Sequence, residues 1–404
     1  MYDIIVIGGG AAGFFTAINA AERKSGLKIA ILERGRDVLQ KVKVSGGGRC
    51  NVTHACFEPE KLVKFYPRGE NELLEPFRKF NPSHTIEWFE KHGVKIKKEA
   101  DGRMFPESNT SQSIIDCLVG AVRQLKIEVL TNARVESLDY QNPNWRLNVA
   151  GDRILQSKKL MIATGSDTAV WNLLEKLNIN IIPPVPSLFT FNIKDERLTD
   201  LMGLSVVNAA CKIKRNAQLI TTGPLLITHW GLSGPAALKL SAWAARELNQ
   251  ANYKFTLLVN WLNISNLEEV KKHLHEQINV QAKKNVMLNA EFGVPIRLWK
   301  SLCKAAQIGE FQKWAETGKK HIQRLAEQLT ACEFEVNGKS TFKEEFVTAG
   351  GVDLSEFNFE TYSLKKYPTL FMAGEVLNID AITGGFNFQA AWTGGWIAAK
   401  GLTG

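Results

Sequence analysis

The sequence lacks paired cysteines: six of its 404 residues are cysteine, and no two stand in a C-x-x-C spacing. This excludes the usual patterns of a zinc site and of a dithiol redox motif, so we expect no bound metal and reduced thiols. No unbroken apolar run approaches the length that spans a bilayer, and we expect no membrane partner. A strand that begins at residue 2 leaves no room for a cleaved signal peptide, which predicts a cytoplasmic protein.

Long runs of positive charge are also missing, although the formal net charge at pH 7 is +9. The lysines lie in short clusters, such as residues 95–98 and 271–272. This spread favours a solvated basic surface over a nucleic-acid partner. Because 45% of the residues are hydrophobic, the chain can bury a large core in two or three domains.

The N-terminal residues show the pattern of a dinucleotide-binding unit. An apolar, β-branched run at residues 2–7 predicts a buried parallel strand, and an Ala-rich stretch to about residue 23 predicts a helix. Between them, Gly8, Gly10 and Gly13 stand in G-x-G-x-x-G spacing. The first glycine permits the tight turn, the second lets the backbone approach a pyrophosphate, and the third lets the helix pack on the strand. The helix N-terminus favours a diphosphate through its free amides and its dipole.

A second predicted strand, at residues 28–32, ends on Glu33, twenty positions after Gly13. In a Rossmann unit a carboxylate at this position binds the ribose hydroxyls of an adenosine, and it favours an unphosphorylated ribose. FAD and NAD both satisfy this pattern. A lone G-x-G-x-x-G often marks only a glycine-rich loop, but the strand, helix, second strand and carboxylate together indicate a dinucleotide.

A glycine-rich segment follows at residues 41–53, where Gly46, Gly47 and Gly48 precede Arg49. A loop of this kind can lay its backbone against a ligand, and the arginine can reach a phosphate or a flavin carbonyl. The alternative is a flexible surface loop. Its position directly after the β-α-β unit favours contact with the other half of the ligand.

The middle of the chain is predicted to change from helices to strands. Residues 57–125 look mostly helical, with a loop at residues 101–108. Two antiparallel strands are expected at residues 135–140 and 145–149.

Three prolines between residues 181 and 186 mark a change of character, because they cannot continue a helix or a central strand. Short β-rich runs beyond them predict a β-domain, in which residues 219–222 and 225–228 form separate strands. Helices are predicted between residues 267 and 329, the last of them over residues 311–329.

One histidine of the β-domain is a candidate catalytic residue. His229 lies in a glycine-rich loop that opens a helix after Pro235. It can serve as a proton donor to a substrate. The alternative is a hydrogen-bonded packing residue beside Trp230.

Two further strands end on residues that suit a cofactor. Small residues close the strand at residues 159–165 and leave room at the carboxyl edge of the sheet. The strand at residues 370–375 ends on Glu375, whose carboxylate can bind ribityl hydroxyls. The glycine-rich junction at residues 380–389 then opens a helix. Its N-terminus at residues 385–387 can point at the flavin N1/C2 carbonyl and stabilise the negative charge of reduced flavin.

These junctions together indicate FAD rather than NAD, because NAD needs one ADP site whereas three further glycine junctions need a flavin end. The cofactor domain is then discontinuous, over residues 1–187 and 346–404, around a β-rich substrate domain at 188–262 and 330–345 and a helical insert at 263–329. We expect the junctions to bind FAD non-covalently through Gly8, Gly10, Ala11, Ala12, Gly13, Glu33, Arg34, Lys43, Ser45, Gly46, Gly47, Gly48, Arg49, Cys50, Asn51, Ala163, Thr164, Gly165, Gly374, Glu375, Gly384, Gly385, Phe386 and Asn387.

Four motifs carry a resemblance to a known group. They are Ser-Gly-Gly-Gly-Arg-Cys-Asn at residues 45–51, Gly-Arg-Met-Phe-Pro at 102–106, Thr-His-Trp-Gly-Leu-Ser-Gly-Pro-Ala at 228–236, and the segment from Gly-Glu to Gly-Gly-Phe-Asn at 374–387. The chain resembles the BaiN-type family of bacterial FAD-dependent oxidoreductases, which includes aminoacetone oxidase-like enzymes and reductases of dehydro bile acids. The resemblance covers nearly the whole chain. It implies an α/β, Rossmann-like flavoprotein fold of the two-dinucleotide-binding-domain type, with an inserted β-barrel-like domain and a small helical domain.

Two features depart from the family pattern. Ser166 follows Gly165 where the family usually has a second glycine, so the loop is shorter and its cofactor contacts stay open. The chain has no second G-x-G-x-x-G and so no evident NAD(P)H domain. NADH or NADPH, if used as a donor, must dock transiently at the flavin.

The leading hypothesis is an FAD-dependent oxidoreductase that transfers hydride between flavin N5 and a small organic substrate. No residue is required as a nucleophile, and a packing role is favoured for Cys50. Two alternatives stay open. The first is an FAD-dependent protein that modifies RNA such as tRNA, for which the lysines of residues 271–284 and 319–320 would gather on one face. The second is a non-catalytic flavin-binding redox sensor. The substrate and the oligomeric state are not indicated by the sequence.

Overall fold

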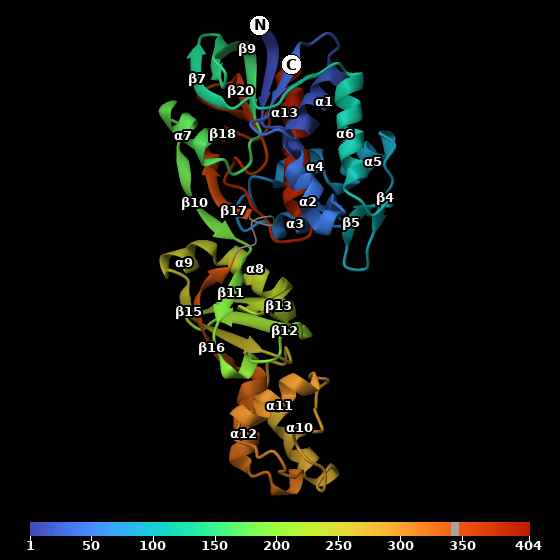
Figure 1. Cartoon of the computed structure of the whole chain (residues 1–404), viewed down its shortest axis with the longest axis vertical. Helices are drawn as coiled ribbons and strands as arrows, with labels where there is room; N and C mark the ends of the chain where they lie inside the picture. Colours follow the sequence, from blue (N-terminus) through green and yellow to red (C-terminus); the bar gives the residue numbers. More distant parts are fainter. Residues whose placement is uncertain (341–346) are drawn as a thin grey trace. The chain divides into compact units, whose positions relative to one another are not determined.

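The computed structural model describes residues 1–340 and 347–404 of the chain (Figure 1). Contacts divide it into a first unit, Met1–Val185 with Val347–Gly404, and a second unit, Pro186–Phe346. The boundaries predicted at residues 187/188 and 345/346 lie close to these divisions. The parts of the predicted domains that fall on residues 341–346 lie outside the described residues.

A nine-stranded sheet forms the centre of the first unit. Its main path has the order β18-β19-β20-β9-β1-β2-β6, and β7 and β8 join it through β9. The strands are β1 (Tyr2–Ile7), β2 (Ile29–Leu32), β6 (Glu128–Leu130), β7 (Val135–Gln141), β8 (Asn144–Val149), β9 (Arg153–Ile162), β18 (Phe357–Asn358), β19 (Ser363–Leu364) and β20 (Leu370–Met372). Strand β1 lies parallel between β2 and β9, with Val6 opposite both Ile31 and Met161. The strands predicted at the N-terminus and the antiparallel β7–β8 pair are confirmed.

The central strands are buried because helices cover them, as is usual for parallel strands. Every residue of β2 is buried, and Ile5 and Val6 of β1 are fully inaccessible. The helices α1 (Ala11–Arg23) and α13 (Phe386–Thr403), from opposite ends of the chain, pack side by side (Figure 1). Small residues allow this approach: a Cβ atom on Gly395 of α13 would lie 3.0 Å from Oγ1 of Thr16 on α1. The sheet edge and both helix N-termini are thereby held in one rigid framework.

A small helical region with its own sheet follows β2 in the chain. Its helices are α3 (Pro59–Leu62), α4 (Leu74–Lys79), α5 (Pro82–Lys91) and α6 (Gln112–Gln124). Three short strands, β3 (Thr53–His54), β5 (Arg103–Pro106) and β4 (Ile96–Lys98), pair in that order. The prediction of a loop at residues 101–108 is therefore wrong over β5. This strand has no apolar/polar alternation, because its last three residues are all buried.

The proline-rich segment forms a strand, β10 (Ile181–Ser187), which pairs with β17 (Val347–Val352) in a sheet that has two strands among the described residues. The prolines predict that this segment is not a central strand. The structure agrees, because both strands of a two-stranded sheet are edge strands. Prolines are tolerated on such an edge because it leaves N–H positions unpaired. The helix α7 (Thr168–Lys176) connects β9 to β10.

The second unit contains a closed barrel with the strand order β11-β14-β13-β12-β15-β16. The strands are β11 (Thr190–Ile193), β12 (Ser205–Ile213), β13 (Asn216–Ile227), β14 (Gly231–Ser233), β15 (Lys254–Asn260) and β16 (Cys332–Ser340), with the helices α8 (Pro235–Trp243) and α9 (Ala245–Gln250). The two strands predicted at residues 219–222 and 225–228 form the single strand β13, which continues through Gly223 and Pro224. Its register to β12 shifts opposite Gly223, which lets the strand continue past the proline.

Three helices, α10 (Leu267–Val280), α11 (Ile296–Ala305) and α12 (Lys319–Thr330), form the helical part of the second unit. Their buried faces join the barrel in one continuous hydrophobic core that includes Trp261, Trp299 and Trp314. The helix predicted over residues 311–329 begins only at Lys319, because a short 3-10 turn occupies residues 314–316. Within residues 1–340 and 347–404, no helix has the length and apolar character needed to cross a membrane.

Candidate functional site

The turn between β1 and α1 contains one open glycine position. Gly8 has a φ of 111°, and a Cβ atom there would lie 2.3 Å from the backbone oxygen of Ala163. A Cβ atom on Gly13 would lie 2.0 Å from the oxygen of Gly8, so the fold itself requires both glycines. Gly10, the N-cap of α1, meets only the Ala163 oxygen, at 4.0 Å. The first turn of α1 has no side-chain cap and no acidic residue, which leaves space and a positive helix end for an anion.

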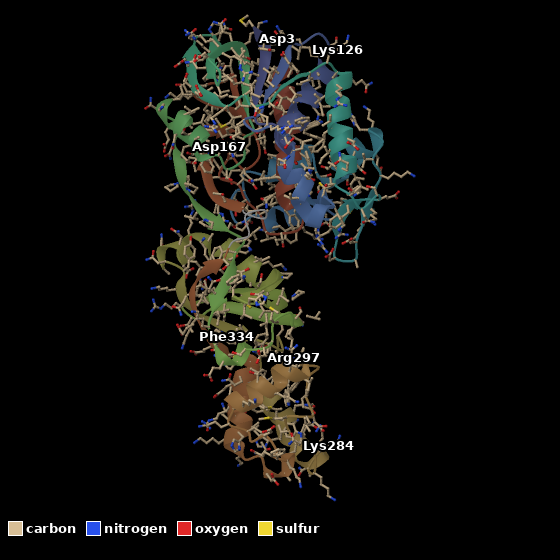
Figure 2. The ribbon with its side chains drawn as sticks, in the orientation of Figure 1. Asp3, Lys126, Asp167, Lys284, Arg297 and Phe334 are labelled. Carbon is tan, nitrogen blue, oxygen red and sulfur yellow. The ribbon has the colours of Figure 1, made fainter. Side chains whose placement is uncertain are left out.

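Glu33 lies directly after β2, at the predicted position. Its Oε2 accepts a hydrogen bond from the amide of Gly9 at 2.9 Å, and its Oε1 accepts one from the amide of Gly35 at 2.8 Å. These bonds orient the carboxylate, and each oxygen keeps a lone pair for a hydroxyl donor. The side chain of the next residue, Arg34, pairs with Asp167 at 2.7 Å (Figure 2 labels Asp167). Its assignment to the cofactor stays a prediction.

The triple-glycine segment begins as a helix and then opens. The helix α2 (Gln40–Gly48) keeps helical geometry only before Ser45, whose ψ is 149°, so the loop predicted from residue 41 starts late. The three glycines have positive φ values. A Cβ atom on Gly46 would lie 2.9 Å from the amide nitrogen of Asn51, whereas Gly47 and Gly48 have no described neighbour within 4 Å of that position. Two successive residues are thus open to a ligand that lies against the backbone.

The two residues that follow the glycines are held by the protein. Arg49 Nη1 lies 2.6 Å from Oε1 of Glu99, and its guanidinium carbon lies 4.0 Å from the ring centre of Phe105. The predicted contact of Arg49 with a phosphate or flavin carbonyl stays untested. Cys50 is fully buried, and burial raises the pKa of its thiol to about 12. The thiol is therefore protonated at neutral pH, which agrees with the predicted packing role.

The carboxyl ends of β9 and β20 lie next to each other, because these strands pair in parallel. Oε2 of Glu375 lies 2.5 Å from Nζ of Lys41 on α2. A Cβ atom on Gly165 would lie 3.6 Å from the same carboxylate oxygen. The hydroxyl of Thr164 is buried and has no hydrogen-bond partner among the described residues. A buried polar atom of this kind needs a partner, and a bound ligand can supply one.

The N-terminus of α13 follows two glycines with positive φ. A Cβ atom on Gly385 would lie 2.6 Å from the backbone oxygen of Thr53 and 2.9 Å from Oδ1 of Asn51, so the Ser-Gly-Gly-Gly-Arg-Cys-Asn motif reaches this helix start. The first turn has no side-chain cap and no acidic residue. Asn387 accepts a hydrogen bond from the amide of Ala381 at 2.9 Å and donates one to its oxygen at 3.2 Å. Its side chain therefore stabilises the preceding loop.

A buried polar network fixes α13 against the strand β3 and the helix α5. Oε1 of Gln389 accepts hydrogen bonds from the hydroxyls of Thr53 at 2.6 Å and of Thr85 at 2.9 Å. Its Nε2 donates to the hydroxyl of Thr393 at 3.0 Å. All four side chains are fully buried, so losing one partner leaves a costly unsatisfied group. The network holds the start of α13 in a fixed position.

The residues present fit an extended dinucleotide. Open glycine positions at Gly10, Gly47 and Gly48 and the unpartnered hydroxyl of Thr164 all lie in the first unit. The other predicted cofactor residues also belong to that unit. Tightly packed glycines, such as Gly13, are required by the fold, whereas the open positions leave space that a ligand could occupy.

His229 belongs to the second unit, in the turn between β13 and β14. The amide of Thr228 donates to the oxygen of Gly231 at 2.8 Å and closes this turn. The His229 side chain is exposed, and no hydrogen bond to its ring is found in the part of the chain that the structure describes. The interpretation as a hydrogen-bonded packing residue is therefore wrong. Its role as a proton donor stays a prediction.

Two residues that the sequence does not single out join the site. Lys41 pairs with Glu375, and His54 stacks on Phe386 with ring centres 4.6 Å apart. Nδ1 of His54 is buried without a hydrogen-bond partner among the described residues, and burial lowers the pKa of this imidazole. The position of Lys41 beside the glycine segment is a weak sequence signal. His54 has none, because its contacts come from the distant residues Asp101 and Phe386.

Comparison with known sequences supports the family resemblance. The profile of the "HI0933-like protein Rossmann domain" family matches residues 2–401. The ribosomal RNA dihydrouridine synthase of Escherichia coli is 28% identical over 410 residues, which cover 99% of this chain and 98% of that protein. The 3-dehydro-bile acid delta(4,6)-reductase of Clostridium scindens is 24% identical, with 99% of this chain and 98% of that protein covered. The predicted membership of the BaiN-type group is confirmed.

Solved structures share the fold at low identity. The 3-ketosteroid-delta4-(5alpha)-dehydrogenase of Rhodococcus jostii RHA1 matches with a TM-score of 0.52 at 14% identity, covering 100% of this chain and 96% of that one. The open conformation of a flavocytochrome c3 fumarate reductase matches with a TM-score of 0.51 at 14% identity, covering 100% of this chain and 78% of that one. The predicted α/β flavoprotein fold with an inserted barrel and a helical part is confirmed.

Proposed function

The chain belongs to the HI0933-like family of FAD-dependent oxidoreductases, and on this premise we propose that it reduces the C5=C6 double bond of a uridine in RNA. FAD, when bound, supplies the two-electron carrier chemistry that amino-acid side chains lack. The observation that carries the proposal is the end-to-end match, at 28% identity, to a ribosomal RNA dihydrouridine synthase. The net charge of +9 is compatible with a polyanionic substrate, although the spread of the lysines along the sequence does not by itself indicate one.

The names of the two curated relatives describe one kind of chemistry. Dihydrouridine is uridine with hydrogen added across C5=C6, a bond conjugated to the C4 carbonyl. A delta-4 bond in a 3-dehydro steroid is likewise conjugated to a ketone. In each case hydride adds to the carbon far from the carbonyl, and a proton adds to the near carbon. An enzyme for either reaction must hold the conjugated carbonyl and supply one proton.

The first unit offers groups for each part of the cofactor. The open helix end at Gly10 suits the diphosphate, and the oriented carboxylate of Glu33 suits the ribose hydroxyls. Glu375, held by Lys41, suits hydroxyls of the ribityl chain. The uncapped N-terminus of α13 suits an electron-rich carbonyl oxygen, because its free amides and dipole need no rearrangement.

The electrons must come from a second molecule. We expect NADH or NADPH as the donor. Because the sequence contains no second G-x-G-x-x-G, the nucleotide would dock only transiently. One NAD(P)H and one proton are then consumed for each uridine, and NAD(P)⁺ and dihydrouridine are released. The exposed imidazole of His229 is the candidate proton donor.

A second candidate function is the reduction of a small conjugated ketone. It is favoured by the match, at 24% identity, to a bile acid reductase that also covers the whole chain. Both candidates use the same cofactor and the same bond chemistry. They differ only in the substrate that the chain accepts.

The test combines the FAD-loaded chain anaerobically with NADH or NADPH and either transcribed ribosomal RNA or a 3-keto-delta-4 steroid. The expected result is RNA that yields dihydrouridine, two hydrogens heavier than uridine, on digestion and mass spectrometry. Nucleotide oxidation with the steroid but not with RNA would select the second candidate. Oxidation with neither substrate would contradict both. The variant His229→Gln tests the proton donor, with a slower turnover and an unchanged rate of flavin reduction as the expected result.

A further inference from the structure

One end of the helical part of the second unit is formed by two adjacent loops. Residues 280–288 and 310–315, which we call the tip loops, run antiparallel. The amide of Trp314 donates to the oxygen of Lys284 at 3.0 Å, and the amide of Val286 donates to the oxygen of Gln312 at 3.0 Å. Asn285 and Lys313 face each other in an isolated bridge. Figure 2 shows Lys284 at the end of the helical part away from Phe334 of the barrel, whereas Arg297 lies at the end near Phe334.

The tip loops expose large apolar side chains. Phe311 is 83% exposed, more than any other large hydrophobic residue in the described part of the chain. Val280 and Leu288 are 75% and 62% exposed. Trp314, three positions after Phe311, is fully buried, so the loop has an inner and an outer side. Monomeric proteins rarely gather such residues on one surface without a partner.

The tip loops are also basic. Lys283, Lys284 and Lys313 are exposed, and none forms an ion pair with any described residue. No acidic residue occurs between Glu276 and Glu291. Residues 263–329 contain eleven lysines and arginines against seven aspartates and glutamates. Two acidic residues, Glu310 and Glu316, lie within or next to the loop at residues 310–315. Glu316 accepts a hydrogen bond from the amide of Lys313.

The gathering of lysines on one face, which the RNA-modifying alternative requires, stays a prediction. Lys283 and Lys284 lie on the exposed tip, but Lys271 is partly buried and pairs with Glu268 at 2.8 Å.

The tip loops are supported from below, so their exposure is not the result of missing packing. The indole of Trp299 donates to the backbone oxygen of Val286 at 2.8 Å, and its ring lies beside Trp314. Val286 and both tryptophans are fully buried. Because the loops are already packed on this support, binding at Phe311 orders its side chain but need not order the loops.

We propose that the tip loops bind single-stranded RNA, with Phe311 stacking on a base and Lys283, Lys284 and Lys313 contacting phosphates. This combination of one exposed aromatic ring and unpaired cations matches the physics of single-stranded nucleic-acid binding. A protein partner is less well matched, since lysine is depleted in the buried centres of protein interfaces. The inference rests on the proposed function, because a uridine must leave its stack before its C5=C6 bond can be reached.

The test measures binding of a fluorescein-labelled, uridine-rich RNA oligonucleotide to the FAD-loaded chain without NAD(P)H, across a salt series. Phe311→Ala is expected to weaken binding about tenfold, since a stacked base contributes on the order of 1–3 kcal/mol. Each of Lys283→Gln, Lys284→Gln and Lys313→Gln should reduce the salt slope by about 0.7. The control variants are Val207→Ala, also highly exposed but on β12, and Lys254→Gln on β15, and neither should change binding.

The outcomes separate this inference from the proposed function. If RNA binding depends on the tip loops but no dihydrouridine forms, the RNA-binding role of the tip loops is supported and the proposed function is contradicted. If dihydrouridine forms and all four tip variants bind RNA as tightly as the native chain, the RNA-binding role of the tip loops is contradicted and the proposed function is supported. Binding of anionic lipid vesicles that the tip variants lose, with no RNA binding by the native chain, would assign the tip to a membrane surface and overturn the inference. Loss of FAD absorbance in a variant would show misfolding, in which case Phe311→Leu replaces Phe311→Ala, because it keeps the volume and removes the aromatic face.

Discussion

The N-termini of α1 and α13 are alike in sequence and different in surroundings. Each helix has a glycine at its N-cap, no side-chain cap and no acidic residue in its first turn. Gly10 of α1 has an ordinary φ of −95° and open space where a side chain would be. Gly385 of α13 has a φ of 91° and is enclosed by Thr53 and Asn51. The fold explains the second glycine, whereas the first leaves space that the proposed cofactor would occupy.

The largest effect is expected at the enclosed glycine. Gly385→Ala should lower the free energy of unfolding by about 4 kcal/mol, because the new side chain adds a left-handed backbone penalty to an overlap with the Thr53 oxygen. Urea unfolding of the cofactor-free chain measures this. The matched control is Gly93→Ala, which has a φ of 84° but no described neighbour within 4 Å. Its expected loss is about 1–2 kcal/mol, and equal losses in both variants would contradict the enclosed environment of Gly385.

At the open glycine, the effect should fall on the cofactor alone. Gly10→Val should weaken FAD binding by at least about 100-fold, because its side chain fills the space against the helix end. The unfolding free energy of the cofactor-free variant should change by less than about 0.5 kcal/mol. Fluorescence titration with FAD is the measurement. Gly318→Val, at the equally open N-cap of α12, is the control and should leave FAD affinity unchanged.

A smaller loss is expected at the carboxylate after β2. Glu33→Gln keeps the acceptor for one amide but removes the charge that strengthens hydrogen bonds from ribose hydroxyls. FAD affinity should fall about tenfold. Glu128→Gln, an exposed carboxylate that accepts a hydrogen bond from Tyr2, is the control. If the two variants bind FAD equally well, Glu33 has no role in holding the ribose.

The effect that is smallest at neutral pH concerns the buried thiol of Cys50, which lies just after the triple-glycine segment. Its thiol has a folded-state pKa of about 12, against an ordinary value of 9.0. The folded chain therefore keeps this proton where the unfolded chain loses it, so this stabilisation is full below about pH 9 and falls as pH rises toward about 12. The native chain should lose about 1 kcal/mol more per pH unit than Cys50→Ala in this window. Parallel pH profiles in the two chains would contradict the burial of the thiol.

The sequence predicts the local structure around the candidate cofactor site well. Gly8, Gly10, Gly13 and Glu33 lie within one β-α-β unit, and their geometry follows from neighbours a few positions away. The strands β1 and β2 and the helix α1 are predicted for the same reason.

Features that depend on distant residues are predicted poorly. The strand β5 lies between β4 and the distant strand β3, and the role of Gly385 depends on contacts with residues more than 300 positions earlier. The Gln389 network likewise joins residues of three separate segments. No local pattern marks such positions, because the partners that define them meet only in the folded chain.

The central claim is that the first unit binds FAD at the open glycines, and the visible absorption spectrum of the purified chain tests it most directly. The account predicts the absorbance of oxidised flavin in the native chain, its loss in Gly10→Val and its retention in Gly318→Val. A native chain that is colourless and cannot be reconstituted with FAD would contradict the account.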